Sequence, residues 1–247
     1  MTQDKNKKIY VVYINNNFFY EKLFLDFIKK SPNITKVISV PSKNKLNIGK
    51  LIYYLKFYKL KAFIYLSFKN LICSYKKEVK KECIKNKIIY KEYNNFNEFR
   101  DEVLSSDNLD LIISTIDTKV DEAMLSKPKN GWLNVHCGDL RKYRGINSPF
   151  WTMLHDEKEL TMTIHLMSFE YDKGPIIIEK KIINKKLKFF KTIKTLFSIA
   201  SEELTSLMLD YNKILNPKTI DYKRSKYFSE PKIKDSEKFL KKGLRYI

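Results

Sequence analysis

One stretch decides the fold of this chain, residues 130–180, and it reads NGWLNVHCGDLRKYRGINSPFWTMLHDEKELTMTIHLMSFEYDKGPIIIEK. It holds all three histidines, both tryptophans and four of the six glycines. Apolar and polar residues alternate from Trp132 to His136, which predicts a strand. Side chains two positions apart share a face of a strand, so Asn134 and His136 should lie side by side. An amide beside an imidazole suits proton transfer and oxyanion stabilisation.

A second alternating run, Thr161–Leu166, and a turn, Tyr171–Pro175, follow in the same stretch. The turn carries Asp172, a carboxylate that can orient an imidazole or accept a proton through water. The residues alone leave two interpretations open. One is a catalytic cluster, and the other is a buried polar pair beside an ordinary Asp-x-Gly turn.

Four short motifs in this stretch resemble those of the folate-dependent formyltransferases, which include the glycinamide ribonucleotide, methionyl-tRNA and nucleotide-sugar enzymes. The motifs are Asn134-Val135-His136, Lys142-Tyr143-Arg144-Gly145, Thr163-Ile164-His165 and Asp172-Lys173-Gly174. The resemblance implies a Rossmann-like formyltransferase fold, with N10-formyltetrahydrofolate as cosubstrate. It also implies that His136 and Asp172 manage protons, and that Asn134 stabilises the oxyanion.

The resemblance further implies a binding site for each substrate. In the family, one loop after a sheet strand and one loop before the catalytic aspartate line the pterin pocket. The matching residues here are Ile116, Asp117, Thr118, Lys119, Val120, Ser168, Phe169, Glu170 and Tyr171. The acceptor is assigned to Tyr143, Arg144 and Gly145. The alternative for 116–120 is a simple connection between a strand and a helix.

The sequence departs from the family at positions that shape the acceptor pocket. Cys137–Arg141 stands where the family has a small residue followed by Ser-Leu-Leu-Pro, and Thr161 replaces a glycine. No glycine-rich phosphate loop follows the first predicted strand, which disfavours a dinucleotide. The resembling glycinamide ribonucleotide enzymes typically carry a glycine-containing loop there, so the resemblance also counts against that acceptor. About 30 residues follow Pro217, too few for the C-terminal domain of the tRNA enzymes. Elimination and analogy with the family make the amine of a nucleotide-linked sugar the expected acceptor, with glycinamide ribonucleotide or methionyl-tRNA as the alternative amines.

Strand-like and helix-like runs alternate along the rest of the chain. Strands are expected at 8–14, 36–40, 87–90 and 110–115, and helices at 18–30, within 46–86, at 96–105 and at 192–215. This rhythm predicts an α/β fold with a mostly parallel twisted sheet and helices on both faces. We expect residues 1–185 to form the catalytic domain and residues 186–247 a small helical and irregular C-terminal extension. The lysines within residues 46–86 are expected on the solvated side of the helices of that segment.

The composition, 43% apolar and 31% charged, is typical of a soluble globular protein. No apolar run is long enough to span a bilayer or to serve as a signal peptide, so we expect a cytoplasmic protein without a membrane partner. Three cysteines lack metal-ligand spacing, so we expect free thiols and no metal site. Cys137 is disfavoured as a nucleophile because adjacent strand residues face opposite ways.

The formal net charge of +20 would attract nucleic acid. The lysines are spread along a chain rich in Asn, Ile and Tyr, which indicates compositional bias rather than a nucleic-acid site. The remaining alternative from another class is a basic RNA-binding protein on an enzyme-like scaffold, against which the Asn134, His136 and Asp172 set argues. His165 is expected in the core or pocket wall, and His155 at an exposed helix end. Whether the chain forms a homodimer stays open.

Overall fold

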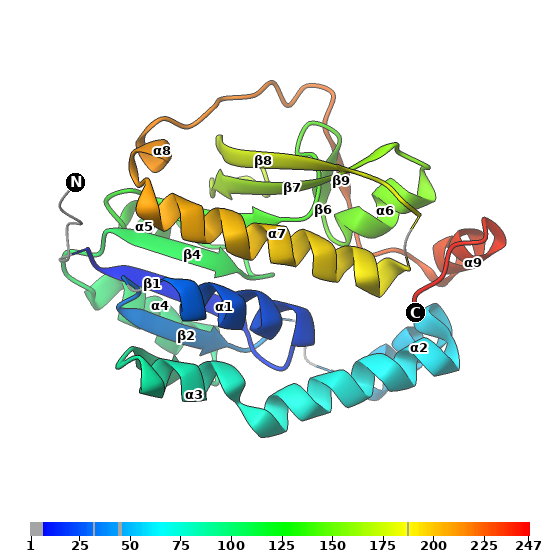
Figure 1. Ribbon diagram of the computed structural model, residues 1–247, viewed down its shortest axis with the longest axis horizontal. Coiled ribbons are helices and arrows are strands. Elements are labelled where there is room, and N and C mark those ends of the chain that lie inside the picture. The colour runs from blue at the N-terminus through cyan, green and yellow to red at the C-terminus, as the bar shows by residue number, and fades with distance from the viewer. Residues whose placement is uncertain (1–6, 32, 44–45, 187) are drawn as a thin grey trace.

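The computed structural model describes residues 7–31, 33–43, 46–186 and 188–247. Within these residues, a seven-stranded sheet has the order β3-β2-β1-β4-β5-β7-β8 (Figure 1). Its strands are β1 (Ile9–Ile14), β2 (Lys36–Val40), β3 (Ile89–Glu92), β4 (Leu111–Thr115), β5 (Trp132–His136), β7 (Glu159–Leu166) and β8 (Ile176–Ile183). The strands from β3 to β5 run parallel, whereas β7 and β8 pair antiparallel. The predicted mostly parallel α/β sheet is confirmed.

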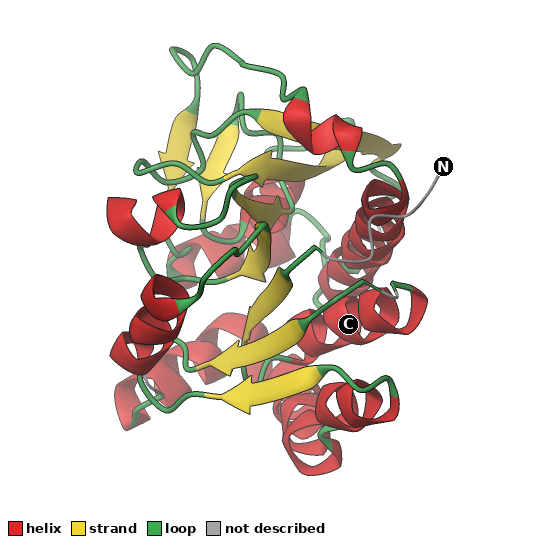
Figure 2. Cartoon of the chain, turned by 90° about the vertical axis from the view of Figure 1, so that its left-hand side faces the viewer, coloured by secondary structure: helices red, strands yellow, loops and turns green. Residues whose placement is uncertain are grey.

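Helices cover both faces of this sheet (Figures 1 and 2). They are α1 (Phe18–Lys30), α2 (Ile48–Lys76), α3 (Glu78–Lys85), α4 (Phe96–Ser105), α5 (Glu122–Ser126), α6 (Ser148–Leu154), α7 (Phe189–Leu209), α8 (Asn212–Leu215) and α9 (Ile233–Lys241). Helices α1 and α7 pack on one face, and α4 and α5 on the other. Strand β1 is apolar at every position because both of its faces are buried.

The alternation of side chains along β5 determines which face of the sheet its polar residues occupy. Leu133 and Val135 belong to the core beneath α1 and α7, while Trp132 packs in the core beneath α4. Asn134 and His136 share the face of Trp132 because side chains of a strand alternate. Strand β7 pairs with β5 so that His165 lies opposite Asn134. The sheet therefore gathers an amide and two imidazoles on one face.

The segment after residue 185 differs from the sequence prediction in detail. The helix expected at 192–215 begins at Phe189 and ends at Leu209, because Asp210 has a non-helical conformation, and α8 is separate. The region after residue 222 contains α9 and a short strand, β9 (Lys226–Phe228), which pairs with β6 (Tyr143–Gly145). Helix α7 packs against α1 in the main core, and a domain boundary at residue 185 stays a prediction.

Helix α2 is the outlying element of the structure. It is kinked at Lys59, which has a φ of 63° and a ψ of 160°. Only Phe57 and Ala62 among its described residues are fully buried. The described lysines of α2 are exposed or half-buried, as predicted, and the exposed surface of α2 also carries many large apolar side chains. No helix in the described part of the chain is long and apolar enough to cross a membrane.

Candidate active site

His136 is the last residue of β5, and its ring is held from one side. Its Nε2 lies 2.8 Å from the backbone carbonyl of Tyr143 and 3.0 Å from the Ser148 hydroxyl. A carbonyl only accepts, so Nε2 carries the proton of the neutral ring and Nδ1 holds its lone pair. Nδ1 lies 3.7 Å from Oδ2 of Asp172. The fold therefore turns the basic nitrogen of His136 toward a carboxylate.

Asp172 reaches this place through a tight turn between β7 and β8. Its φ is 52°, a left-handed conformation that Asp and Asn tolerate better than most residues. The backbone N–H of Gly145 donates to Oδ2 at 2.7 Å, which fixes the carboxylate. Gly174 passes so close to β7 that an added Cβ would meet the Leu166 carbonyl oxygen. The Asp-x-Gly motif is thus what allows the turn to fold down beside His136.

Asn134 and His165 complete the cluster. His165 donates from Nδ1 to the Leu166 carbonyl at 2.8 Å, which leaves Nε2 as an acceptor. The Asn134 amide donates toward that Nε2 at 3.4 Å, and Asp172 Oδ1 lies 3.7 Å from the same atom. Burial lowers the pKa of His165 to about 4, against the opposing effect of Asp172. His165 is therefore neutral near pH 7, and it is buried, as predicted for a core position.

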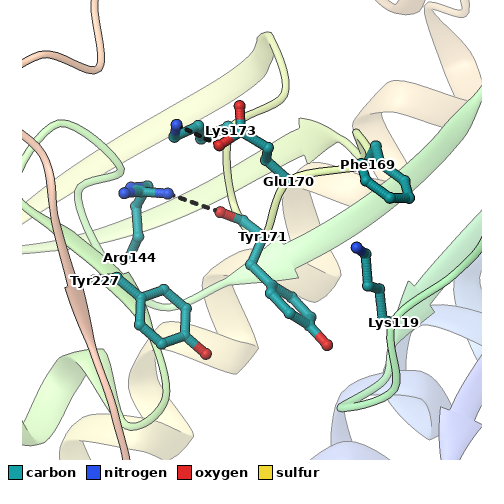
Figure 3. Close-up of a pocket in the computed structure, with 7 residues that line it drawn as sticks. All are labelled: Lys119, Arg144, Phe169, Glu170, Tyr171, Lys173 and Tyr227. Atoms are coloured by element: carbon teal, nitrogen blue, oxygen red, sulfur yellow. Dashed lines mark hydrogen bonds and ion pairs between the residues drawn. The ribbon is translucent and has the colours of Figure 1, made fainter.

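A hollow of about 330 Å³ is lined in part by Tyr171 and Lys173, the chain neighbours of Asp172 (Figure 3). Its lining residues are Lys119, Arg144, Phe169, Glu170, Tyr171, Lys173 and Tyr227. Lys119 comes from the loop after β4, and its Nζ lies 3.5 Å from the ring centroid of Phe169 in the loop before Asp172. Residues from the two loops predicted for the pterin therefore line the same hollow. Arg144, predicted for the acceptor, donates to the Tyr171 carbonyl at 3.0 Å in the same place.

The other residues predicted for the cosubstrate lie outside the lining of this hollow. Asp117 accepts from the Ser42 hydroxyl at 2.6 Å and joins its loop to the segment after β2. Thr118 donates to Asp117 at 3.4 Å, and Ser168 donates to the Glu170 carbonyl at 2.9 Å. Ile116 and Val120 pack in the core beneath α4. These side chains hold the shape of the loops, while Lys119, Phe169, Glu170 and Tyr171 face the hollow.

Strand β6 sends its side chains in two directions. The Tyr143 hydroxyl donates to Glu157 at 3.1 Å, and its ring stacks on Phe228. That ring lines a second hollow of about 220 Å³ with Lys142, His155, Arg224, Lys226 and Phe228. The backbone carbonyl of Tyr143 accepts a hydrogen bond from His136, and the backbone N–H of Gly145 donates one to Asp172. Of the three residues predicted for the acceptor, only Arg144 points its side chain into the hollow of Figure 3.

Sequence reasoning missed two residues of the site. Ser148 is buried, and its hydroxyl contacts both His136 and the Tyr143 carbonyl. Its only signal is a Ser-Pro pair at a helix start, which is common in proteins. Tyr227 comes from β9, whose three residues carry no recognisable pattern.

Burial raises the pKa of the Cys137 thiol, which agrees with its rejection as a nucleophile. No group of His, Cys, Asp or Glu in the described residues could hold a metal ion.

An acid–base cluster beside the carboxyl ends of parallel strands is the arrangement of an α/β enzyme. Residues 35–189, more than half of the chain, match the formyl transferase family model. The chain belongs to this family. The match confirms the resemblance drawn from the four motifs.

Individual relatives share parts of this chain. The methionyl-tRNA formyltransferase of Thermotoga neapolitana is 30% identical over 142 residues, which are 56% of this chain and 45% of that protein. The chain thus matches less than half the length of this curated relative. Two solved structures share the fold. The sugar 3N-formyltransferase WlaRD, crystallised in the presence of dTDP and 5-N-formyl-THF, has a TM-score of 0.60 at 18% identity, over 91% of this chain and 70% of that one. The N-formyltransferase from Helicobacter canadensis, in complex with folinic acid and dTDP-3-aminofucose, has a TM-score of 0.58 at 16% identity, over 91% and 71%.

Proposed function

We propose that this protein transfers a formyl group from N10-formyltetrahydrofolate to the primary amine of a nucleotide-linked amino sugar. The observation that carries the proposal is the cluster of Asn134, His136 and Asp172, together with a hollow that both predicted pterin loops and the chain neighbours of Asp172 line. Membership of the formyl transferase family supports the reaction type. The hollow supports a folate donor because it offers aromatic walls and cations to a flat ring with an anionic tail.

The reaction forms a bond from the amine nitrogen to the formyl carbon and breaks the bond from that carbon to the folate nitrogen. The protein must therefore remove a proton from the amine, supply one to the departing nitrogen and stabilise a negative oxygen. His136 takes the proton on Nδ1, because the Tyr143 carbonyl already holds its Nε2–H. Asp172, 3.7 Å from Nδ1, stabilises the resulting imidazolium and helps to return the proton.

Asn134 supplies the oxyanion donor. A side-chain amide has two N–H groups, so one can point to His165 Nε2 while the other meets the developing charge. Burial keeps His165 neutral, and a neutral ring does not compete with His136 for the negative charge of Asp172. The two imidazoles therefore have different roles, although both lie at the same distance from Asp172. His136 carries the proton, and His165 stays neutral.

The acceptor assignment rests on the charges around the hollow. Lys119, Arg144 and Lys173 line it, with Glu170 as the single carboxylate among its lining residues. Arg144 and Tyr227 lie across the hollow from Lys119 and Phe169 of the pterin loops (Figure 3), so the Arg144 guanidinium can bind the phosphates of a nucleotide-linked sugar and the Tyr227 ring offers a surface for its base. The solved relatives that were crystallised with dTDP or dTDP-3-aminofucose are consistent with this acceptor. Methionyl-tRNA is the second candidate, since the curated relative from Thermotoga neapolitana carries that activity in its name.

A panel of acceptors tests the proposal. Purified protein is incubated with N10-formyltetrahydrofolate and, separately, with a dTDP-linked amino sugar, a UDP-linked amino sugar, glycinamide ribonucleotide or methionyl-tRNA. Release of tetrahydrofolate is followed, and the formylated product is identified by mass spectrometry. We expect turnover with a nucleotide-linked amino sugar. Turnover with methionyl-tRNA alone would reassign the acceptor and keep the reaction. No turnover with any amine, together with RNA binding that survives moderate salt, would favour the RNA-binding alternative.

A further inference from the structure

The second half of α2 carries a continuous apolar stripe on its outer surface. The stripe consists of five residues at spacings of four, four, three and four: Leu60, Ile64, Phe68, Leu71 and Tyr75. At about 100° per residue these positions fall within an arc of about 80° on one side of the helix. Their side chains have exposed fractions of 55% to 88%. Figure 1 shows α2 along the outer edge of the molecule, away from the sheet.

The stripe is not part of the core that holds α2 in place. The inner side of the helix uses other residues, with Ala62 buried and Tyr65 and Leu66 packed against the main core. The side chain of Asn70 accepts from the Phe18 N–H at 2.9 Å and ties α2 to α1. A row of large apolar side chains that the core does not need marks an interaction surface.

The charges of α2 decide which partner fits the stripe. Residues 48–76 contain six lysines and no aspartate or glutamate, and Lys61, Lys69 and Lys76 lie in the half with the stripe. A second copy would bring one helix whose charged residues are all lysines against another, and the net charge of +20 on each chain would oppose the pairing. An anionic surface accepts the lysines and, if it is a bilayer, the apolar stripe as well. Exposed lysines beside an exposed apolar stripe suit a segment that rests on the surface of an anionic membrane.

We propose that α2 docks this protein on an anionic lipid membrane. The stripe enters the boundary between headgroups and acyl chains, the second half of α2 lies in the plane of the membrane, and Lys61 meets the anionic headgroups. Lys61 is exposed, and no ion pair to it is present among the described residues. This revises the expectation of no membrane partner, and it is compatible with the finding on membrane-crossing helices, because a docked helix lies on the bilayer.

Co-sedimentation with lipid vesicles tests the proposal. Vesicles of phosphatidylglycerol and phosphatidylcholine are compared with vesicles of phosphatidylcholine alone, at low and moderate salt. The test variant is Ile64→Glu with Leu71→Glu, which puts two charges into the stripe. The matched control is Ile183→Glu with Leu209→Glu, which removes two apolar side chains of comparable exposure, 74% and 68%, and adds the same charge elsewhere.

We expect the natural protein to bind anionic vesicles and the stripe variant to bind at least about tenfold more weakly. The control should stay within about twofold of the natural protein, since it changes the net charge equally. Absence of binding by the natural protein would overturn the proposal. Equal losses in both variants would overturn it too, because they would show only a response to net charge. A stripe variant that turns a dimer into a monomer, without a vesicle effect, would assign the stripe to a second copy.

Discussion

Replacing Asp172 by asparagine tests the proposed proton chemistry most directly. Asparagine keeps the size of the side chain, tolerates the φ of 52° and still offers an oxygen to the Gly145 N–H, so the fold should survive. What disappears is the negative charge 3.7 Å from His136 Nδ1. At that distance, with an effective dielectric constant of about 20, a carboxylate stabilises an imidazolium by about 4 kcal/mol. This corresponds to roughly a thousandfold in rate.

We therefore expect Asp172→Asn to lower kcat by about a hundredfold to a thousandfold, measured by tetrahydrofolate release with the acceptor found in the panel. The melting temperature should change by less than about 4 °C. The matched control is Asp156→Asn, because Asp156 has a φ of 56° and is half-exposed in an ion pair with Lys242. Its kcat should stay within about twofold. A kcat within about fivefold of normal for Asp172→Asn, with an unchanged melting temperature, would refute the role of the carboxylate.

The remaining predictions concern the side chains around this carboxylate. Asn134→Ala and His136→Ala should each lower kcat at least about a hundredfold with an unchanged far-UV spectrum, and near-normal rates for both would contradict the assignment. Ser148→Ala should lower kcat about tenfold with little change in KM, because its hydroxyl positions the His136 ring, and Ser148→Thr should recover part of the loss. His155→Ala should keep turnover within about threefold, since His155 is exposed at the end of α6, and a deep loss would place it in the site. The pKa of His165 is lowered to about 4, so the unfolded chain binds the proton more tightly and stability falls as the pH drops from about 6.5 toward 4. Urea unfolding at pH 7 and pH 4.5 should show a smaller acid loss for His165→Asn than for the natural protein, and equal losses would contradict the burial effect.

The sequence predicted the parts of the site that depend on local periodicity. A strand period of two is enough to place Asn134 and His136 on one face, and the apolar runs are enough to predict the parallel sheet. The contact of Asp172 with the cluster depends on how a turn folds back over β5, which is a tertiary feature. The family resemblance supplied that contact, and the 3.7 Å separations agree with it.

Two features were beyond sequence reasoning for physical reasons. Tyr143 and Arg144 are neighbours in a three-residue strand, so they point to opposite sides, and the motif alone did not show which side faces the hollow. The apolar residues of α2 are spread around the helix, so the helical period could not tell which side would pack and which would stay exposed. Because of the kink at Lys59, the two halves of α2 also run in different directions.

The pairing of β6 with β9 has a consequence for how this protein folds. Strand β6 supplies the carbonyl for His136 and the N–H for Asp172, and it is itself held by residues about eighty positions further along the chain. Ser225 binds both Arg144 and the Leu140 carbonyl in the same region. Contacts of such long sequence separation close late, after the local βαβ units have formed. During synthesis the sheet can therefore assemble before the cluster does, and the chain gains its organised acid–base residues only when the segment around Lys226 has been made and has docked.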